Sequence, residues 1–421
     1  MIKTCLCECR RTEPDWRRWA LVLTAATFLF AAQCTAQSTT PATATGDVKP
    51  AAAPLPATTN PSQKGAPVPN AKPSPQYMDY LDSAEAVDHA VEVTFVPRKP
   101  PMDLPPITAA WKAIVADASR PPENIVADTS RPPVKIIYDT DIGTDVDDAI
   151  ALAFALRRPE LQVLAVTTSR KEVHQRAAIV SRLLQVMGRT DVPYAPGSPI
   201  LADGTVSRET KPVNQFPFAG PENDRPKPAC ADAQELFRQV ITANPGEVWL
   251  VIVGPFTNAA ILIRDHPDLA AQLKGMVCMG GDLSRAQNET NIDNDRPAAP
   301  IVYASGLLKF DGTDNVTMRI LVPKQDIEHL RSADTPTTRA LLELIGYWKK
   351  TTAYSKPGPA LFDLCPVVWL FRPDLFTTIQ TGIEVKGAKT FASADAPPCA
   401  ATTDVDAVAV HRLMMDTLTA K

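Results

Sequence analysis

The 421-residue sequence has little glycine, no excess of positive charge and no apolar run long enough to cross a membrane comfortably. It carries 43 Lys and Arg against 47 Asp and Glu, a formal net charge of −4. Binding to a phosphate backbone needs a basic surface, so this balance disfavours a nucleic-acid partner. Glycine numbers 18 and proline 41, the reverse of average usage. Part of the chain must therefore be strongly biased in composition.

The apolar run at residues 19–32 is 14 residues long, and arginines precede it. A membrane-spanning helix needs about 20 residues, whereas a signal peptide has a shorter apolar core after a basic segment. Cys34 and Ala36 are small residues that suit cleavage after Ala36. We therefore expect residues 1–36 to be a signal peptide and the protein to be periplasmic or secreted. An uncleaved membrane anchor and a lipid-linked Cys34 are the alternatives, and membrane attachment is expected only through them.

The prolines cluster between Gln37 and Pro133, where 18 prolines but only two glycines occur among Ala, Thr, Ser and Asn. Such segments cannot bury enough apolar surface to offset the loss of chain entropy. Residues 37–133 are therefore predicted to be a low-complexity tether. A tandem duplication at residues 114–122 and 125–133 has too few copies for a solenoid.

Cysteines are also few in the remaining chain. Four of the eight lie in the predicted signal peptide, and the others match no metal-binding spacing: Cys230, Cys278, Cys365 and Cys399. Export would allow one or two disulfides, whose pairing the sequence does not define. Cys278 and Cys365 lie in apolar runs and are expected in the core.

Residues 134–421 alternate between predicted strands and predicted helices. The strand candidates are apolar runs at residues 134–138, 161–167, 248–253 and 275–279, and the helix candidates are residues 147–156, 176–187 and 258–263. This rhythm predicts one α/β domain with a mostly parallel open sheet flanked by helices. Ligands in such folds bind beyond the carboxyl ends of the strands, so the residues after each strand are the candidates for function.

An acidic cluster follows the first predicted strand. Five carboxylates fall within ten residues: Asp139, Asp141, Asp145, Asp147 and Asp148. At pH 7 they would repel one another, and a helix N-terminus offsets only about 0.3–1 kcal/mol per charge. A hard divalent cation offsets more, and oxygen ligands suit Ca²⁺ or Mg²⁺, while Gly143 permits the tight bend. A solvated acidic turn is the alternative.

Small and polar residues follow the later strands. The sequence Gly-Pro-Phe-Thr-Asn occupies residues 254–258, and Met-Gly-Gly-Asp occupies residues 279–282. Glu289 and Asn291 offer hydrogen-bonding groups for sugar hydroxyls. Asp363 stands in an apolar context, where an unpartnered acid is costly, so a metal or hydrogen-bonding partner is expected.

These motifs together resemble the inosine–uridine-preferring nucleoside hydrolase family. Its opening Asp-x-Asp-Pro-Gly-x-Asp-Asp-Ala motif is similar to residues 139–149, with two extra residues after the glycine. Its Gly-Pro-Leu-Thr-Asn, Met-Gly-Gly and Glu-Phe-Asn segments are similar to residues 254–258, 279–281 and 289–291. Four motifs in the same order cover nearly all of residues 134–421.

The resemblance implies Ca²⁺-dependent hydrolysis of the N-glycosidic bond of a ribonucleoside or another N-riboside, and it is compatible with a homo-oligomer. It implies Ca²⁺ ligands at Asp141, Asp148, the Thr257 carbonyl and Asp363. Asp141 would also take a proton from the attacking water. The implied substrate-binding residues are Asp147, Glu172, Met279, Glu289 and Asn291.

Three departures from the family pattern stand out. A Gly-Asn pair near the second strand end is replaced by residues 167–172, where Glu172 is the candidate to contact ribose instead. Phe362 precedes Asp363 where some members have a histidine that protonates the leaving base. The short stretch between Gly281 and Glu289 removes an asparagine that the family uses on the sugar.

Two other functions are compatible with parts of the pattern. A sugar- or nucleoside-binding module without turnover would explain Phe362. A haloacid-dehalogenase-type phosphatase would explain an Asp-x-Asp motif after a strand, but Ile142 breaks its spacing and the later motifs stay unexplained.

Overall fold

The computed structural model describes residues 107–118, 130–207, 209, 211–285, 287–351 and 358–421. The predicted signal peptide and most of the predicted tether lie outside these residues. All of the described residues belong to one compact unit. Among them, no helix combines the length and apolar character that a membrane span requires.

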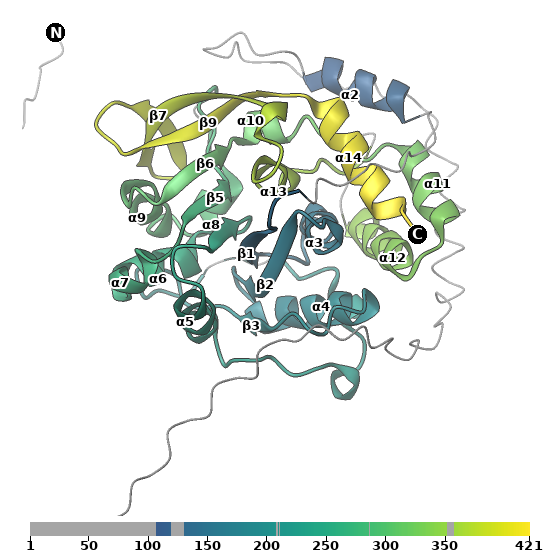
Figure 1. The fold of residues 1–421 in the computed structure, drawn as a ribbon, viewed down its shortest axis with the longest axis horizontal. Helices are drawn as coiled ribbons and strands as arrows, with labels where there is room; N and C mark the ends of the chain where they lie inside the picture. Colours follow the sequence, from purple (N-terminus) through teal and green to yellow (C-terminus); the bar gives the residue numbers. More distant parts are fainter. Residues whose placement is uncertain (1–106, 119–129, 208, 210, 286, 352–357) are drawn as a thin grey trace, which may run out of the picture. The chain divides into compact units, whose positions relative to one another are not determined.

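A nine-stranded sheet runs through the described part of the chain in the order β3-β2-β1-β4-β5-β6-β9-β7-β8 (Figure 1). Pairing is parallel from β3 to β9, and β7 and β8 complete one edge in antiparallel pairing. The strands are β1 (Val134–Thr140), β2 (Leu161–Thr168), β3 (Tyr194–Pro196), β4 (Trp249–Ile252), β5 (Gly275–Met279), β6 (Leu308–Gly312), β7 (Phe376–Lys386), β8 (Lys389–Ser393) and β9 (Pro398–Val405). The predicted mostly parallel sheet is therefore confirmed.

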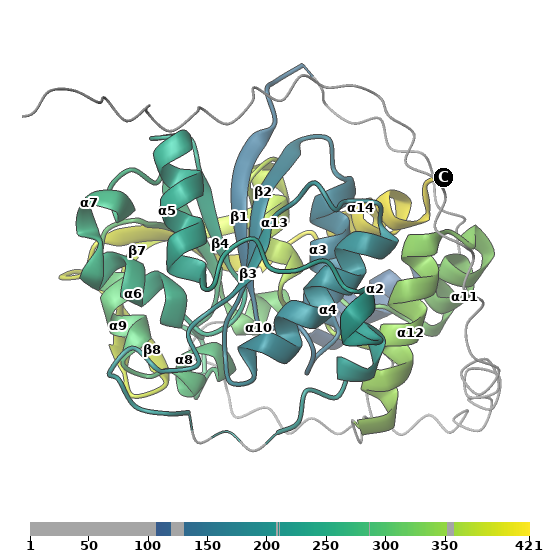
Figure 2. The same ribbon diagram turned by 90° about the horizontal axis from the view of Figure 1, so that it is seen from below.

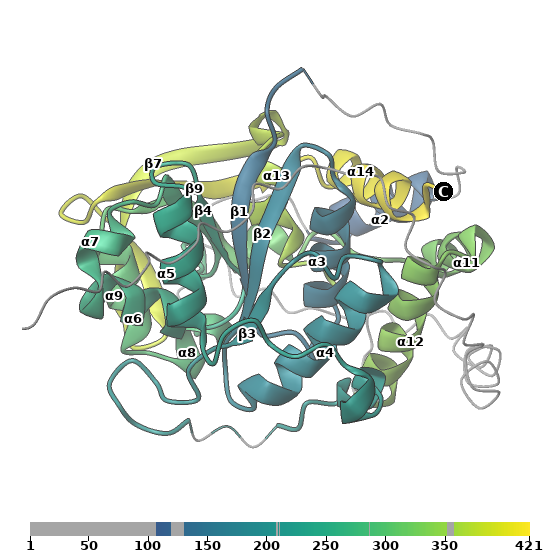
Figure 3. The ribbon, with the colours of Figure 1, turned by 60° about the horizontal axis from the view of Figure 1, so that its bottom comes forward.

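Helices cover both faces of this sheet, as Figures 2 and 3 show. One layer contains α3 (Asp147–Arg157), α4 (Val173–Val186), α11 (Lys324–Ala333), α12 (Pro336–Thr351), α13 (Leu364–Trp369) and α14 (Ala407–Thr419). The other contains α5 (Ala233–Ala243), α6 (Thr257–Asp265), α7 (Pro267–Ala270) and α9 (Ala298–Ala304). The short helices α8 (Thr290–Asn294) and α10 (Asp314–Thr317) follow β5 and β6.

Strand β1 contributes side chains to the cores on both faces of the sheet, because successive side chains point to opposite faces. Ile136 and Tyr138 join the core under α3, whereas Ile137 joins the core under α5 and α6. A strand buried on both faces has a continuous apolar sequence, which is the pattern that identified β4.

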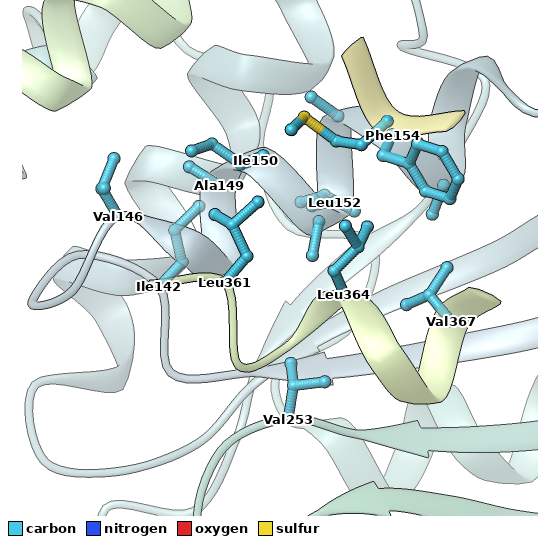
Figure 4. Packing of buried hydrophobic residues seen from close by; sticks show 14 of the residues in the cluster. Ile142, Val146, Ala149, Ile150, Leu152, Phe154, Val253, Leu361, Leu364 and Val367 are labelled. Atoms are coloured by element: carbon cyan, nitrogen blue, oxygen red, sulfur yellow. The ribbon is translucent and has the colours of Figure 1, made fainter. Parts of the chain in front are cut away.

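Apolar side chains hold the acidic turn between β1 and α3 against the first core. Ile142 and Val146 of this turn are fully buried, and they pack in the same cluster as Leu361 and Leu364, which flank Asp363 (Figure 4). In the β1–α3 turn and in the segment around Asp363, buried apolar residues are thus interspersed with the acids. The packing of these apolar residues determines where the acids lie.

The four cysteines in the described residues are free and buried. Cys278 and Cys365 are fully buried in the core, as predicted. Burial raises the pKa of the Cys278 thiol well above its usual value.

The structure differs from the sequence expectation before Val134. Helix α2 (Ile107–Asp117) lies within the span predicted as tether and packs on α14. Its Ile114 is fully buried in the first core, and Asp117 pairs with Arg412 of α14. The proline-rich composition of the whole span concealed a short segment with apolar residues at helical spacing.

Substitution of Ile114 tests whether α2 belongs to the folded domain. Ile114→Ala should lower the free energy of unfolding by about 2–5 kcal/mol, because it leaves a cavity in the core. Lys112→Ala, at an exposed position of the same helix, should change it by less than about 0.5 kcal/mol. Chemical denaturation of the full chain measures both, and equal small effects would show that α2 contributes nothing to stability.

Candidate active site

The candidate site lies where the strand order changes direction. β2 and β4 flank β1, so the carboxyl ends of β1 and β4 meet at the switch point of the sheet, where ligands bind in open α/β folds. Gly254 makes this approach close: a Cβ there would lie 2.9 Å from the Asp141 backbone nitrogen and 3.0 Å from the Asp141 Cβ. The predicted Gly-Pro-Phe-Thr-Asn turn therefore faces the predicted acidic turn directly.

Three buried carboxylates come together at this point. Asp147 and Asp148 form the first turn of α3, and Asp363 immediately precedes α13. One carboxylate oxygen from each lies within 4.8 Å of the others. Oxygen donors at this separation could hold a hard divalent cation.

Burial is the largest cause that raises the pKa of all three acids well above the usual value. The nearby charges of Asp145 and Asp141 raise the pKa of all three further, and Asp147 and Asp148 also raise that of Asp363. The hydrogen bond from Thr140 Oγ1 and the charge of Arg176 lower the pKa of Asp148, and Asp147 accepts a hydrogen bond from the Phe362 backbone N–H at 3.1 Å. The protein alone therefore offsets only part of the negative charge of the three carboxylates. Their oxygen atoms are suitable ligands for a divalent cation.

Asp141 is held by two arginines rather than by the acidic trio. Its Oδ2 accepts a hydrogen bond from Arg170 Nη1 at 2.7 Å. Arg176 donates to the Asp141 carbonyl, to the Ile142 carbonyl at 3.1 Å and to Thr144 Oγ1 at 3.1 Å. Arg170 thus fixes the side chain of Asp141, and Arg176 fixes the backbone of the acidic turn.

Gly143 completes this turn with φ +118°, a conformation that L side chains rarely adopt. A Cβ there would also lie 2.6 Å from Val213 Cγ1 and 2.8 Å from Ile179 Cδ1. Glycine is therefore required for both the bend and the packing, as the sequence predicted for the bend.

Asp139 has a different role from its neighbours. Its Oδ1 accepts hydrogen bonds from Thr167 Oγ1 at 2.7 Å and from Asn258 Nδ2 at 2.8 Å. Asn258 also donates to the Thr168 carbonyl at 3.0 Å and accepts from the Ser198 N–H at 3.0 Å. Burial raises the pKa of Asp139 to about 7. Asp139 and Asn258 therefore join the ends of β1 and β2 to α6.

The remaining predicted substrate residues lie at the same edge of the sheet. Glu289 caps α8 by accepting hydrogen bonds from the N–H groups of Asn291 at 2.8 Å and Ile292 at 2.9 Å. Asn291 Nδ2 donates to the carbonyls of Val253 at 3.0 Å and Met279 at 3.2 Å. Helix α8 is thereby anchored to the ends of β4 and β5. Burial raises the pKa of Glu289 to about 8.

Thr257 and Glu172 occupy contrasting environments. Thr257 is buried at the start of α6, and its Oγ1 donates to Asp295 Oδ2 at 2.6 Å. Glu172 has an exposed side chain and a left-handed backbone at φ +63°, immediately before α4. In residues 167–172 it is Arg170, not Glu172, that contacts an acid of the site. The assigned roles of Thr257 and Glu172 stay predictions.

Sequence reasoning missed Arg170, Arg176 and Glu209. The segment that replaces the family's Gly-Asn pair contains Arg170, so its unusual composition was the available signal. Arg176 lies in α4, where the sequence predicted a helix but no contact with the acidic turn. Glu209 lies between strands in a region without periodicity, and nothing in the sequence connects it with Arg170.

Comparison with known proteins agrees with this geometry. The family described as inosine-uridine preferring nucleoside hydrolase matches residues 136–412. A pyrimidine-specific ribonucleoside hydrolase of an Enterobacter species is 35% identical over 260 residues, covering 58% of this chain and 82% of that protein. Its Salmonella newport counterpart is 32% identical over 284 residues, covering 62% of this chain and 91% of that protein.

Solved structures of nucleoside hydrolases have the same fold as this chain. A plant nucleoside hydrolase superposes with a TM-score of 0.62 at 25% identity, covering 69% of this chain and all of that one. A purine-preferring ribonucleoside hydrolase from Gardnerella vaginalis shares the fold with a TM-score of 0.60 at 21% identity, covering 68% of this chain and 98% of that one. The four motifs, the site at the switch point and these similarities establish that the chain belongs to the inosine–uridine-preferring nucleoside hydrolase family of N-glycosyl hydrolases.

Proposed function

We propose that this protein catalyses Ca²⁺-dependent hydrolysis of the N-glycosidic bond of ribonucleosides. The observation that carries the proposal is the buried trio of Asp147, Asp148 and Asp363 beside Asp141 at the switch point of the sheet. Buried acids at this density stay ionised only beside a positive charge, and oxygen-only donors favour Ca²⁺ over softer metals.

Asp148 and Asp363 are the proposed cation ligands, together with Asp141 and the Thr257 carbonyl. When bound, Ca²⁺ would position and polarise the attacking water. Asp147 lies within the same 4.8 Å group and would bind ribose hydroxyls beside the cation. The Phe362 N–H holds Asp147 Oδ2 in place and leaves its other oxygen for the substrate.

Asp141 is the proposed general base. The residue is only 6% exposed, so a water molecule beside its carboxylate would be shielded from bulk solvent. A base held within hydrogen-bond reach of the attacking water removes its proton as the new bond forms at C1′. The surrounding carboxylates stabilise the positive charge that builds on the ribose as the base departs.

Glu289, Asn291 and Met279 form the proposed far wall of the ribose site. This role is proposed from their position. Helix α8 is anchored to the carboxyl ends of β4 and β5, which lie on the same side of the sheet as the carboxyl end of β1. With a pKa of about 8, Glu289 is largely protonated at pH 7 and could donate a hydrogen bond to a sugar hydroxyl.

Phe362 favours a second candidate function. A phenyl ring has no ionisable proton, so the side chain before Asp363 cannot protonate the leaving base. A nucleoside-binding protein without turnover is therefore the alternative. The relatives' names include both pyrimidine-specific and purine-preferring enzymes, so the proposal assigns no base preference.

Replacement of the proposed base separates these functions. Asp141→Asn should lower the rate of base release by about 10²–10⁴-fold, because the amide cannot accept the water proton. Asp265→Asn, at the exposed end of α6, is the matched control and should keep the wild-type rate. Chromatographic detection of free base across the common nucleosides in Ca²⁺ measures the effect.

Each alternative has its own signature in the same assay. Nucleoside binding by calorimetry without any free base from the wild type would favour the binding protein. Phosphate release from a monoester without base release would favour the phosphatase. An undiminished rate in Asp141→Asn would exclude it as the base.

Thermal unfolding in a chelator tests the charge argument. An Asp whose folded pKa lies above its unfolded value stabilises the fold at low pH, and this stability is lost as pH rises above about 4 through the folded pKa. Asp363→Asn should therefore raise the unfolding midpoint at pH 8, by about 2–4 °C for each raised pKa unit, and leave it unchanged at pH 4.

Calcium should reverse this pattern. Saturating Ca²⁺ should raise the wild-type midpoint more at pH 8 than at pH 5, because protons compete for the same carboxylates. Asp363→Asn should lose most of that gain. A gain that is equal at both pH values, or equal in the variant, would show that Ca²⁺ binds elsewhere.

A further inference from the structure

We infer that Arg170 is a positioning residue for Asp141: locked in place by Glu209, it occupies one carboxylate oxygen of Asp141 and leaves the other for the cation and the attacking water. This inference rests on the proposed function of Asp141. It assigns a role to a residue that stands where the family pattern has a different sequence.

The guanidinium of Arg170 is held between two acids. Nη1 donates to Asp141 Oδ2 at 2.7 Å, while Nε and Nη2 donate to the two oxygens of Glu209. The side chains are nearly inaccessible, with exposed fractions of 6% for Arg170, 8% for Asp141 and 7% for Glu209. Such a planar, bidentate arrangement is specific to arginine, because lysine cannot form the same fork.

The backbone around Arg170 supports the same geometry. Arg170 has φ +69°, in the left-handed region that non-glycine residues seldom adopt. Departures of this kind persist where the surrounding structure imposes them, and they cluster at functional sites. The next residue, Lys171, donates its Nζ to the Glu209 carbonyl at 2.7 Å. Two consecutive cationic residues therefore bind Glu209 by both its side chain and its backbone.

This anchoring means that Arg170 stays in place when a cation binds. Moving the guanidinium away would break its two charge-assisted hydrogen bonds to Glu209 as well as the one to Asp141, and would leave the buried Glu209 carboxylate without its cationic partner. Asp141 can then offer only Oδ1 to ligands in the site. Without Arg170, the Asp141 carboxylate would be free to rotate, and neither oxygen would be held in a fixed orientation toward the attacking water.

The two consequences of removing Arg170 have opposite signs. Loss of a positive charge beside the cation site should tighten cation binding. Loss of the fixed carboxylate orientation should slow the chemical step. A substitution that merely damages the fold would weaken cation binding and turnover together, so the opposite signs identify a positioning role.

The test compares Arg170→Ala with Arg225→Ala. Arg225 lies in the same connection as Glu209 and donates to the Gly220 carbonyl, so its replacement controls for general effects on that segment. For Arg170→Ala, calorimetry should show Ca²⁺ bound about tenfold more tightly. Its kcat for base release should fall by about 10²-fold with little change in KM. Arg225→Ala should match the wild type in all three quantities.

Two further variants keep the test decisive. If Arg170→Ala does not fold because two acids lose their partner, Arg170→Ala/Glu209→Gln removes one of those charges and carries the same comparison. Added guanidinium ion at non-denaturing concentration should restore part of the kcat of Arg170→Ala, whereas Arg170→Lys should restore less than the native fork provides.

The outcomes separate this inference from the proposed function. Wild-type base release with an unchanged kcat and Ca²⁺ affinity in Arg170→Ala would overturn the inference and leave the proposed function standing. A joint loss of Ca²⁺ affinity and kcat would also overturn it. Absence of base release from the wild type would overturn the proposed function, and the Ca²⁺ titration of Arg170→Ala would then decide the inference alone.

Discussion

The constraint on which this structure depends is the burial of several carboxylates within one small volume. Asp147, Asp148 and Asp363 are each about 3% exposed, and Asp141 lies close enough to raise the pKa of all three. Ordinary folds avoid such a cluster because repulsion and desolvation both oppose ionisation. Its persistence requires positive charge, which the protein supplies in part through Arg170 and Arg176. These two arginines leave a net negative charge among the acids, and a divalent cation would offset part of it.

The cluster is held in place by its apolar neighbours rather than by its own interactions. Ile142 and Val146 anchor the β1–α3 turn, and Leu361 and Leu364 anchor the segment around Asp363. Side chains in a closely packed core have few alternative positions, so the intervening acids cannot separate to relieve their repulsion. Gly254 adds the approach of the β4 end, which leaves no room for a side chain at that position. The packing energy of the core thus offsets the repulsion among the buried acids.

Part of the fold and part of the candidate site could be predicted from the sequence. Strand β4 was visible because burial on both faces makes it a continuous apolar run, and the acidic turn was visible because its residues are contiguous. Asp363 stood out as an acid among apolar residues. Arg170 and Glu209 could not be paired in advance, because 39 residues separate them and their contact depends on tertiary structure. The sequence also did not separate Asp139 from Asp141, which belongs to the same motif. In the structure, the contacts of Asp139 with Thr167 and Asn258 link secondary-structure elements. Helix α2 was obscured by prolines on either side.

Positively and negatively charged side chains approach Asp141 from different secondary-structure elements. The arginines approach Asp141 from the β2–α4 side, whereas Asp147, Asp148 and Asp363 lie on α3 and the segment before α13. A ribose that becomes positively charged would be drawn toward the acids, while Asp141 stays paired on its other side. Fixed charges of this kind need no reorganisation during the reaction, which is the condition under which electrostatic stabilisation is most effective. In the proposed mechanism, a base that shares its site with a cation depends on a fixed orientation, and Arg170, held by Glu209, would provide that orientation for Asp141.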